Sequence, residues 1–302
     1  MSGSGLSLAG RTVFVSGASR GIGLAIATAC AAQGARIVIA AKTDRPNPKL
    51  PGTIHTAAEE IRACGGEALA LACDIRDGDA VARAVEAAVD RFGGLDIVVN
   101  NASAISLTGT AETSLKRYDL MTGVNARGSF AVTQAALPHL LLSDAAHILT
   151  IAPPPDLSPR WFARHGAYSL AKYGMSLLTM AWAEEFRGRI AASCLWPRTT
   201  IDTAAVRNLL GGSEMAEASR TPRIMGDAAV AILLRGHAYT GRFCLDDLVL
   251  AAEGVCDFDA YAVRPGVPLQ PDFFVPTDAP PVETAQGLTG WRITQTGRLS
   301  LV

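Results

Sequence analysis

Tyr168 and Lys172 are four residues apart in the segment AYSLAKYG, so on a helix their side chains project from the same face. A phenol with an ordinary pKa of about 10 is a poor acid or base at neutral pH. A nearby ammonium group stabilises the phenolate and lowers that pKa. The pair could therefore make Tyr168 the proton donor to the oxygen of a carbonyl group whose carbon receives hydride. A Tyr-x-x-x-Lys pair alone, however, is most often a chance pairing.

A glycine-rich stretch near the start of the chain could bind the phosphates of a dinucleotide. Residues 13–15 form a short apolar run, followed by SGASRGIG at residues 16–23 and then by a segment of helical character. Glycines at 17, 21 and 23 would let a strand turn sharply and bring bare backbone against a pyrophosphate. The start of the helix adds N–H groups and the positive end of its dipole. A purely structural tight turn is the alternative.

The residues after the second expected strand favour NADP over NAD. A carboxylate that selects NAD usually stands about 20 residues beyond the glycines, where it accepts hydrogen bonds from the ribose. This chain has Ala40, Ala41 and Lys42 at that place, and no acid before Asp44. The ammonium of Lys42 and the guanidinium of Arg20 could both reach a 2′-phosphate. The alternative is that both are solvated surface charges.

Asp74 follows another apolar strand, at residues 69–73. The carboxyl ends of parallel strands face the ligand crevice in a doubly wound fold, so this carboxylate could accept a hydrogen bond from the adenine amino group. A helix-capping role within the segment DIRDGD is the alternative.

Strand and helix signals alternate from residue 11 to about residue 250, the pattern of a parallel sheet covered on both faces. The sequence thus predicts an α/β fold of Rossmann type, a doubly wound sheet of seven parallel strands in one domain at residues 8–256. We expect strands at residues 12–16, 36–41, 68–72, 97–100, 147–151, 191–196 and 242–245. We expect helices at residues 22–33, 79–92, 114–140, 167–187 and 227–234.

Residues 257–302 differ in composition, with six prolines and little periodicity. We expect an extended tail that lies on its own subunit or on a neighbour, with Phe273 and Phe274 as an anchor. Disorder of part of the tail is the alternative.

Taken together, these motifs resemble the short-chain dehydrogenase/reductase family over residues 8 to about 250. SGASRGIG is similar to the family's TGxxxGxG, with Ser16 for the threonine, and NNAS at residues 100–103 is similar to its NNAG, with Ser103 for the glycine. The resemblance implies that Tyr168 is the proton donor and that Lys172 also holds the nicotinamide ribose. It further implies that Asn125, in GVNARG, connects the lysine to bulk solvent through a bound water.

The residues expected to bind NADP(H) come from the glycine-rich stretch, from the segments after the second, third, fourth and sixth strands, and from the catalytic pair. They are Ser16, Gly17, Ser19, Arg20, Gly21, Ile22, Gly23, Lys42, Asp74, Ile75, Asn101, Ala102, Tyr168, Lys172, Pro197, Thr200 and Thr203. The resemblance leaves open whether Thr200 or Thr203 contacts the nicotinamide amide or the pyrophosphate.

A narrower resemblance concerns IAAKTDRPNPKLPGTIHTAAEEI, NNASAISLTGT, and AYSLAKYGMS followed by LWPRTT. These segments are similar to the hydroxysteroid dehydrogenase-like protein 2 subfamily. That similarity implies NADP binding and poorly defined substrates linked to lipid metabolism. Eukaryotic members can carry a further sterol-carrier domain, which we expect this chain to lack.

One departure from the family's pattern concerns a catalytic serine that normally follows the fifth strand. HILTIAPPP has Ala152 and Pro153 there, and neither side chain can donate a hydrogen bond. Loss of one such donor costs about 2.7–4 kcal/mol of transition-state stabilisation, so we expect a slow enzyme or a substitute donor. Ser158, Thr150 and His165 are the candidate substitutes, and each could equally be an ordinary loop or strand residue.

A second departure follows Pro197, where Arg198 replaces the glycine of the family's Pro-Gly turn. Its guanidinium could bind an anionic substrate group such as a carboxylate or phosphate. A structural salt bridge is the favoured alternative.

Composition excludes several classes of function. The 302 residues carry a formal net charge of −1, without the basic stripe that nucleic acid requires. No stretch approaches 18 uninterrupted apolar residues, and the first residues do not form a signal sequence, so we expect a soluble, cytoplasmic protein with no membrane partner. The six cysteines form no CxxC pair and are expected to be reduced core residues, with neither disulfides nor a metal site.

The sequence therefore predicts an NADP-dependent oxidoreductase that moves hydride between nicotinamide and a small carbonyl or alcohol substrate, with lipid-like ketones among the options. One alternative is a dinucleotide-binding regulatory or scaffold protein with weakened catalysis, and another is a reductase of an imine or other C=X bond. The apolar helix at residues 177–186 is expected either to pack on another subunit, in a homodimer or homotetramer, or to belong to the core.

Overall fold

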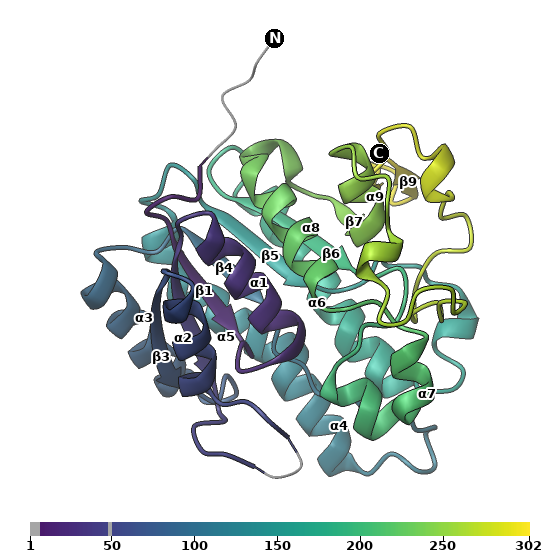
Figure 1. The fold of residues 1–302 in the computed structure, drawn as a ribbon, viewed down its shortest axis with the longest axis horizontal. Helices are drawn as coiled ribbons and strands as arrows, with labels where there is room; N and C mark the ends of the chain where they lie inside the picture. Colours follow the sequence, from purple (N-terminus) through teal and green to yellow (C-terminus); the bar gives the residue numbers. More distant parts are fainter. Residues whose placement is uncertain (1–6, 48–49) are drawn as a thin grey trace.

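A sheet of nine strands forms the centre of the structure, in the order β3-β2-β1-β4-β5-β6-β7-β8-β9 (Figure 1). The structure is a computed structural model that describes residues 7–47 and 50–302. Strands β1 to β7 pair in parallel, whereas β8 and β9 pair antiparallel. The strands are β1 Thr12–Ser16, β2 Arg36–Ala41, β3 Glu67–Ala72, β4 Ile97–Asn100, β5 His147–Ile151, β6 Ala191–Trp196, β7 Phe243–Leu245, β8 Gly290–Ile293 and β9 Leu299–Leu301.

Helices cover both faces of the sheet. The α-helices are α1 Gly21–Ala32, α2 Ile54–Ala63, α3 Gly78–Phe92, α4 Leu115–Thr122, α5 Ser129–Leu140, α6 Gly166–Glu185, α7 Gly212–Glu217, α8 Arg223–Leu234 and α9 Asp246–Ala252. Two segments are π-helical. The first, η1 Gly123–Gly128, joins α4 to α5, and the second, η3 Val206–Leu210, precedes α7. Short 3₁₀ turns are η2 Pro159–Trp161, η4 Gly236–Tyr239, η5 Asp259–Tyr261 and η6 Val282–Thr284.

The two faces of the sheet build two separate apolar cores. Side chains alternate along a strand, so Val13 and Val15 of β1 join one core and Phe14 joins the other. Helices α1, α2, α8 and α9 complete the first core, and Figure 1 shows α1 beside α8 on this face. Helices α3, α5 and α6 complete the second. Because both faces are covered, the parallel strands read as nearly continuous apolar runs.

The predicted fold class is confirmed, and all seven expected strands are present, with β3 one residue longer and β7 one residue shorter at the start than expected. The strand count needs correction, because the chain after residue 257 adds β8 and β9 to the sheet. Both strands are too short to show, in the sequence, the long alternation of apolar and polar residues that predicts a strand. The helix expected at residues 114–140 is α4, η1 and α5 in succession.

The tail lies on its own chain. Strand β8 pairs with β7 through Trp291 and Gly290, and the Trp291 side chain is buried. Phe274, one of the two expected anchors, is fully buried in the same apolar cluster, while Phe273 is partly buried at its edge. The tail therefore extends the sheet and closes the end of the core next to α6.

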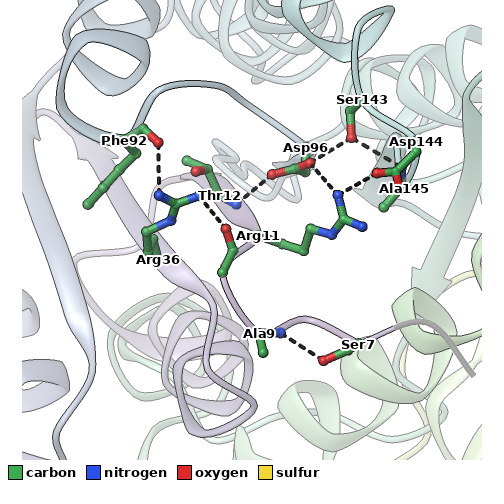
Figure 2. Close-up of polar contacts among 11 residues, drawn as sticks. Ser7, Ala9, Arg11, Thr12, Arg36, Phe92, Asp96, Ser143, Asp144 and Ala145 are labelled. Atoms are coloured by element: carbon green, nitrogen blue, oxygen red, sulfur yellow. Dashed lines mark hydrogen bonds and ion pairs between the residues drawn. The ribbon is translucent and has the colours of Figure 1, made fainter.

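A polar cluster fastens the amino-terminal edge of the sheet (Figure 2). The carboxylate of Asp96, just before β4, accepts hydrogen bonds from the Thr12 backbone N–H at 2.8 Å and from the Ser143 hydroxyl at 2.6 Å. The Arg11 guanidinium pairs with both Asp96 and Asp144. These contacts tie the starts of β1, β4 and β5 together. The opposite edge, at the carboxyl ends of the strands, is where ligands bind in folds of this kind.

The glycine-rich turn between β1 and α1 packs directly on the segment after β4. Gly17 has a φ of +70°, and a Cβ added to it would lie 2.8 Å from the Cα of Ala102. A Cβ on Gly23 would lie 2.4 Å from Nδ2 of Asn101. That amide donates to the carbonyls of Ser16 and Gly17, at 2.9 and 3.2 Å. The absence of side chains at these glycines thus lets two backbone segments touch.

We predict that Gly17→Ala lowers the free energy of unfolding by about 1–3 kcal/mol, because the new methyl group meets Ala102 and the residue must keep a positive φ. Urea denaturation of the purified chain measures this change. Gly78→Ala is the matched control, since an added Cβ there, at the start of α3, meets nothing within 4 Å. A Gly17→Ala protein within about 0.5 kcal/mol of the wild type would contradict the described packing.

Candidate active site

A cavity of about 630 Å³ lies at the carboxyl ends of the parallel strands. It runs from Lys42 and Asp74, which follow β2 and β3, past the glycine-rich turn to Tyr168 and Lys172 of α6. Sites for cofactors and small molecules are typically about 300–1,000 Å³ in volume. The cavity therefore has the position and the size of a ligand site.

Most residues expected at a cofactor line this one cavity. They are Gly17, Ser19, Arg20, Gly21, Ile22, Gly23, Lys42, Asp74, Ile75, Asn101, Ala102, Tyr168, Lys172, Pro197 and Thr203. The structure thus brings together residues that are distributed over almost 190 positions of the sequence, from Gly17 to Thr203.

Ser16 and Thr200 differ from that expectation, because neither lines the cavity. The Ser16 hydroxyl is buried, donates to the Val99 carbonyl and accepts from the N–H groups of Asn101 and Ala102, each at 3.1 Å. It supports the glycine-rich turn from behind. Thr200 is buried, and its hydroxyl bonds to that of Ser219 at 2.7 Å.

The sequence leaves open whether Thr200 or Thr203 contacts the cofactor. Of these two residues, Thr203 lines the cavity and Thr200 does not. Its methyl group lies opposite Gly21 in the glycine-rich turn, where an added Cβ would be 3.4 Å away. Thr203 is therefore placed beside the turn that could hold a pyrophosphate.

Helix α6 presents both Tyr168 and Lys172 to the cavity, as the four-residue spacing predicts. Both side chains are almost fully buried. Lys172 Nζ donates to the carbonyl of Ile151, at the end of β5, at 2.9 Å, and lies 5.1 Å from the ring centre of Trp196. Burial lowers the pKa of this ammonium to about 8.

The pKa of Tyr168 shifts in the direction opposite to the sequence-based expectation. Burial raises it above its ordinary value, and the negative charge of Asp272 raises it further. The expected lowering by Lys172 is not found, and the Lys172 ammonium donates to the Ile151 carbonyl. The phenol is thus protonated at neutral pH and can act as a proton donor.

Asn125 lies behind the cavity, not on its lining, in the π-helical segment η1. Its side-chain amide is buried and binds the backbone of Ala104 twice, accepting from the N–H at 2.7 Å and donating to the carbonyl at 3.1 Å. Ala104 itself lines the cavity. Asn125 therefore positions the wall after β4, and π-helical turns are often found at functional sites.

At the other end of the cavity, Asp74 is paired with Arg76. The guanidinium contacts both carboxylate oxygens, and this contact lowers the pKa of Asp74 below its ordinary value. Helix α3 is instead capped by Asp77, whose carboxylate accepts from the N–H groups of Asp79 and Ala80 at 3.0 and 3.2 Å. Asp74 is therefore not the helix cap, and it lines the cavity together with Arg76.

Arg20 and Lys42 stand at this same end but in different surroundings. The Arg20 guanidinium donates to the carbonyls of Leu50, Pro51 and Gly52, at 3.4, 2.8 and 2.6 Å, and so fastens the loop after β2. Lys42 is exposed on the cavity lining. Lys42 and Arg76, which the sequence did not single out, bring two positive charges to this end of the cavity, and Asp74 brings one negative charge.

The residues proposed to replace the missing serine do not reach the cavity. Ala152 is fully buried in an apolar cluster behind β5. The Thr150 hydroxyl accepts from Thr179 at 2.7 Å, and Ser158 lies on the loop that precedes η2. His165 is buried at the start of α6 among aromatic rings. None of the three lines the cavity, so none is placed to contact a ligand there.

Arg198 forms a structural salt bridge, the alternative that the sequence analysis favours over binding of an anionic substrate group. Its Nε lies 2.6 Å from the buried carboxylate of Asp247, which also pairs with Arg220 at 3.1 Å. Its Nη2 donates to the carbonyl of Pro280 in the tail at 2.9 Å. The guanidinium therefore holds the tail against α9 and does not line the cavity.

Sequence reasoning missed two residues of the tail. Asp272 and Phe273 line the cavity beside Tyr168 and Lys172. The Phe273 carbonyl accepts from the indole N–H of Trp196, at the end of β6, at 2.7 Å. The sequence predicts Phe273 as an anchor of the tail. No motif around Asp272 predicts that it lines the cavity, because only the folding of the tail brings it there.

The structure also bears on metal ions, membranes and disulfides. Across residues 7–47 and 50–302, no cluster of three or more His, Cys, Asp or Glu side chains could bind a metal ion. None of the helices in this described part of the chain combines the length and the hydropathy needed to cross a membrane. The six cysteines are unpaired, and four of them are buried.

Comparison with known proteins agrees with this geometry. The model of the short chain dehydrogenase family matches residues 11–211. Hydroxysteroid dehydrogenase-like protein 2 of Danio rerio is 55% identical over 268 residues, which cover 89% of this chain and 64% of that protein. The chain thus spans less than two thirds of the length of this curated relative.

Two solved structures are similar to the fold. A short-chain dehydrogenase from Mycobacterium thermoresistibile shares 52% identity and a TM-score of 0.86, covering 92% of this chain and 99% of that one. A metagenomic short-chain oxidoreductase in complex with NADP shares 26% identity and a TM-score of 0.64, covering 78% of this chain and 95% of that one. With its glycine-rich turn, its Tyr168–Lys172 pair and these matches, the chain belongs to the short-chain dehydrogenase/reductase family.

Proposed function

We propose that this chain is an NADP-dependent oxidoreductase that interconverts a carbonyl compound and an alcohol, with Tyr168 as proton donor and acceptor. The observation that carries the proposal is the single cavity shared by the glycine-rich turn and the Tyr168–Lys172 pair. One end could hold a nucleotide, and the other presents a protonated phenol and an ammonium.

The residues at the glycine-rich turn fit the diphosphate of a nicotinamide dinucleotide. Gly17 and Gly21 both have positive φ, so bare backbone faces the cavity at this point. Helix α1 begins at Gly21 and carries no acidic residue in its first turn. Its amino-terminal N–H groups and dipole favour a bound anion. When bound, the nicotinamide supplies the hydride that the substrate carbon receives.

The choice of NADP rests on the charges near the adenosine end. Lys42 and Arg76 line the cavity there, and Ala41 stands where a selective carboxylate would accept hydrogen bonds from an NAD ribose. Arg20 contributes by holding the adjacent loop. The similarity to a short-chain oxidoreductase in complex with NADP supports the same choice.

Each residue of the catalytic end has a separate task in this proposal. Tyr168 donates its phenolic proton to the substrate oxygen during reduction and recovers one from solvent afterwards. Lys172, which lines this end of the cavity, binds the ribose hydroxyls. Asn125 holds the Ala104 backbone and supports a water that returns protons to Lys172.

Two other functions use the same residues. A reductase of imines or another C=X bond would differ only in the bound substrate. A dinucleotide-binding scaffold protein is supported by the missing serine, but Tyr168 and Lys172 would then be retained without a task.

The partly exposed Leu170 and Leu177 on α6 support the expectation of a homodimer or homotetramer. A cytoplasmic location completes the proposal.

Lys42→Ala should weaken NADPH binding about tenfold and leave NADH binding unchanged, because an ammonium–phosphate contact contributes about 1.5 kcal/mol or more. Titration calorimetry of both nucleotides with the wild type and the variant measures this difference. Equal affinities of the wild type for NADPH and NADH would refute the cofactor assignment.

Tyr168→Phe should reduce turnover by a factor of about 10²–10⁴ and leave the dissociation constant of NADPH unchanged, because only the transferable proton is lost. The assay follows NADPH oxidation with a panel of ketones, aldehydes, imines and quinones. Tyr173→Phe is the matched control on α6, since the Tyr173 hydroxyl donates to the Asp156 carbonyl and does not line the cavity. Activity retained in Tyr168→Phe would remove the proposed mechanism.

A further inference from the structure

The segment of the tail at residues 270–274 forms part of the catalytic end of the cavity. Its backbone runs antiparallel to the turn after β6: the Thr200 N–H donates to the Gln270 carbonyl at 2.9 Å, and the Asp272 N–H donates to the Arg198 carbonyl at 3.0 Å. An isolated bridge joins Thr199 to Pro271 between these bonds. The backbone of Asp272 is thus fixed to the same turn that carries Pro197 into the cavity.

Phe274 fixes the segment from the other side. Its side chain is fully buried, with ring centres 5.9 Å from Tyr168, 5.2 Å from Tyr173 and 6.1 Å from Trp196. Its φ is +66°, an unusual conformation for a residue other than glycine, which costs about 1–3 kcal/mol and persists only where the surroundings enforce it. Such residues are concentrated at functional sites. Phe273 and Asp272 directly precede this strained residue in the chain.

The carboxyl group of Asp272 acts on both members of the catalytic pair. Its charge raises the pKa of Tyr168 and of Lys172, and the positive charge of Lys172 in turn lowers that of Asp272. One carboxylate oxygen accepts the Phe273 N–H at 2.6 Å. Burial outweighs these contacts and raises the pKa of Asp272 to about 7. In its protonated form this carboxyl group, which lines the cavity, can donate a hydrogen bond.

We propose that Asp272 donates a hydrogen bond to the reacting oxygen of the substrate and so takes the place of the serine that is missing after β5. The inference rests on the proposed oxidoreductase function and adds a second donor to it. Asp272 keeps its own proton throughout, whereas the proton that the substrate oxygen gains in reduction comes from Tyr168. The carboxyl group then stabilises the negative charge that develops on that oxygen.

The position of Asp272 sets it apart from the other polar residues of the region. Thr150, Ser158 and His165 do not line the cavity. Ser103 does line it, but it follows Ala102, which packs against the glycine-rich turn at the part assigned to the nucleotide. Asp272 lines the cavity together with Tyr168 and Lys172, at the end where the proposed chemistry takes place.

This role predicts a pH dependence of known sign. The donor form of Asp272 is the protonated one, so the rate of carbonyl reduction falls as pH rises through about 7. Lys172, which also faces this group, loses its charge at a higher pH of about 8, and Tyr168 titrates higher still. His165 packs against Phe273 and has a lowered pKa, so it is neutral across this range.

The test compares Asp272→Asn with Asp272→Ala in the full chain, using NADPH and the compound of the panel that the wild type reduces fastest. The amide of asparagine donates at every pH, so Asp272→Asn should retain most of the turnover and lose the fall near pH 7. Asp272→Ala should lower kcat by a factor of about 10²–10³ with little change in KM, because the bond strengthens in the transition state. Asp278→Ala, at an exposed position of the same tail, should behave as the wild type.

Two results would overturn the role of Asp272 alone: wild-type kcat in Asp272→Ala, or a loss in Asp272→Asn as deep as in Asp272→Ala. The second result would mean that the ionised carboxylate is needed, as a base or as a ligand for a cationic substrate. A wild type that reduces no compound in the panel would instead refute the proposed function together with this inference.

Infrared difference spectra provide a readout that needs neither nucleotide nor substrate. The band from protonated carboxyl groups should lose intensity as pH rises through about 7 in the wild type. The loss should be smaller in Asp272→Asn, which keeps the buried Asp246, whose pKa burial also raises to about 7. An identical titration of the two proteins would contradict a protonated Asp272. Thermal unfolding of each variant shows whether a lost activity reflects the missing donor or a damaged fold.

Discussion

The close contact between the glycine-rich turn and the segment after β4 is the constraint on which the rest of the site depends. Gly17 and Gly23 can approach Asn101 and Ala102 only because neither carries a Cβ. The Asn101 amide then holds two carbonyls of the turn, and α1 begins beside the cavity. This contact brings the ends of β1 and β4 together and leaves backbone N–H groups free of side-chain cover where a diphosphate would bind.

The tail completes the opposite end of the cavity. Its hairpin of β8 and β9 extends the sheet past β7, and its bonds to the turn after β6 fix the course of residues 270–272. Arg198, in the place of the family's glycine, links this tail to Asp247 of α9. The chain lacks a serine after β5, and the tail that Arg198 contacts brings Asp272 to the cavity lining beside Tyr168 and Lys172.

Local patterns predicted much of this structure. The apolar runs and the glycines predicted seven parallel strands and the first turn, and the four-residue spacing placed Tyr168 and Lys172 on one face of α6. The features that the sequence did not predict depend on contacts between segments that are distant in the chain. The short strands of the tail pair only because β7 offers an edge, Asp272 reaches the cavity only through the folded tail, and the pKa of Tyr168 follows burial and a charge far along the chain.

The central claim is that one cavity holds a nicotinamide nucleotide with its diphosphate on the glycine-rich turn and its reactive ring beside Tyr168. A crystal structure of the chain with NADPH tests this most directly. We predict density for the diphosphate against the backbone of residues 17–23, and for the nicotinamide between Tyr168 and the tail. A nucleotide bound elsewhere, or a nicotinamide ring out of hydrogen-bonding range of any substrate held by the Tyr168 hydroxyl, would contradict the account.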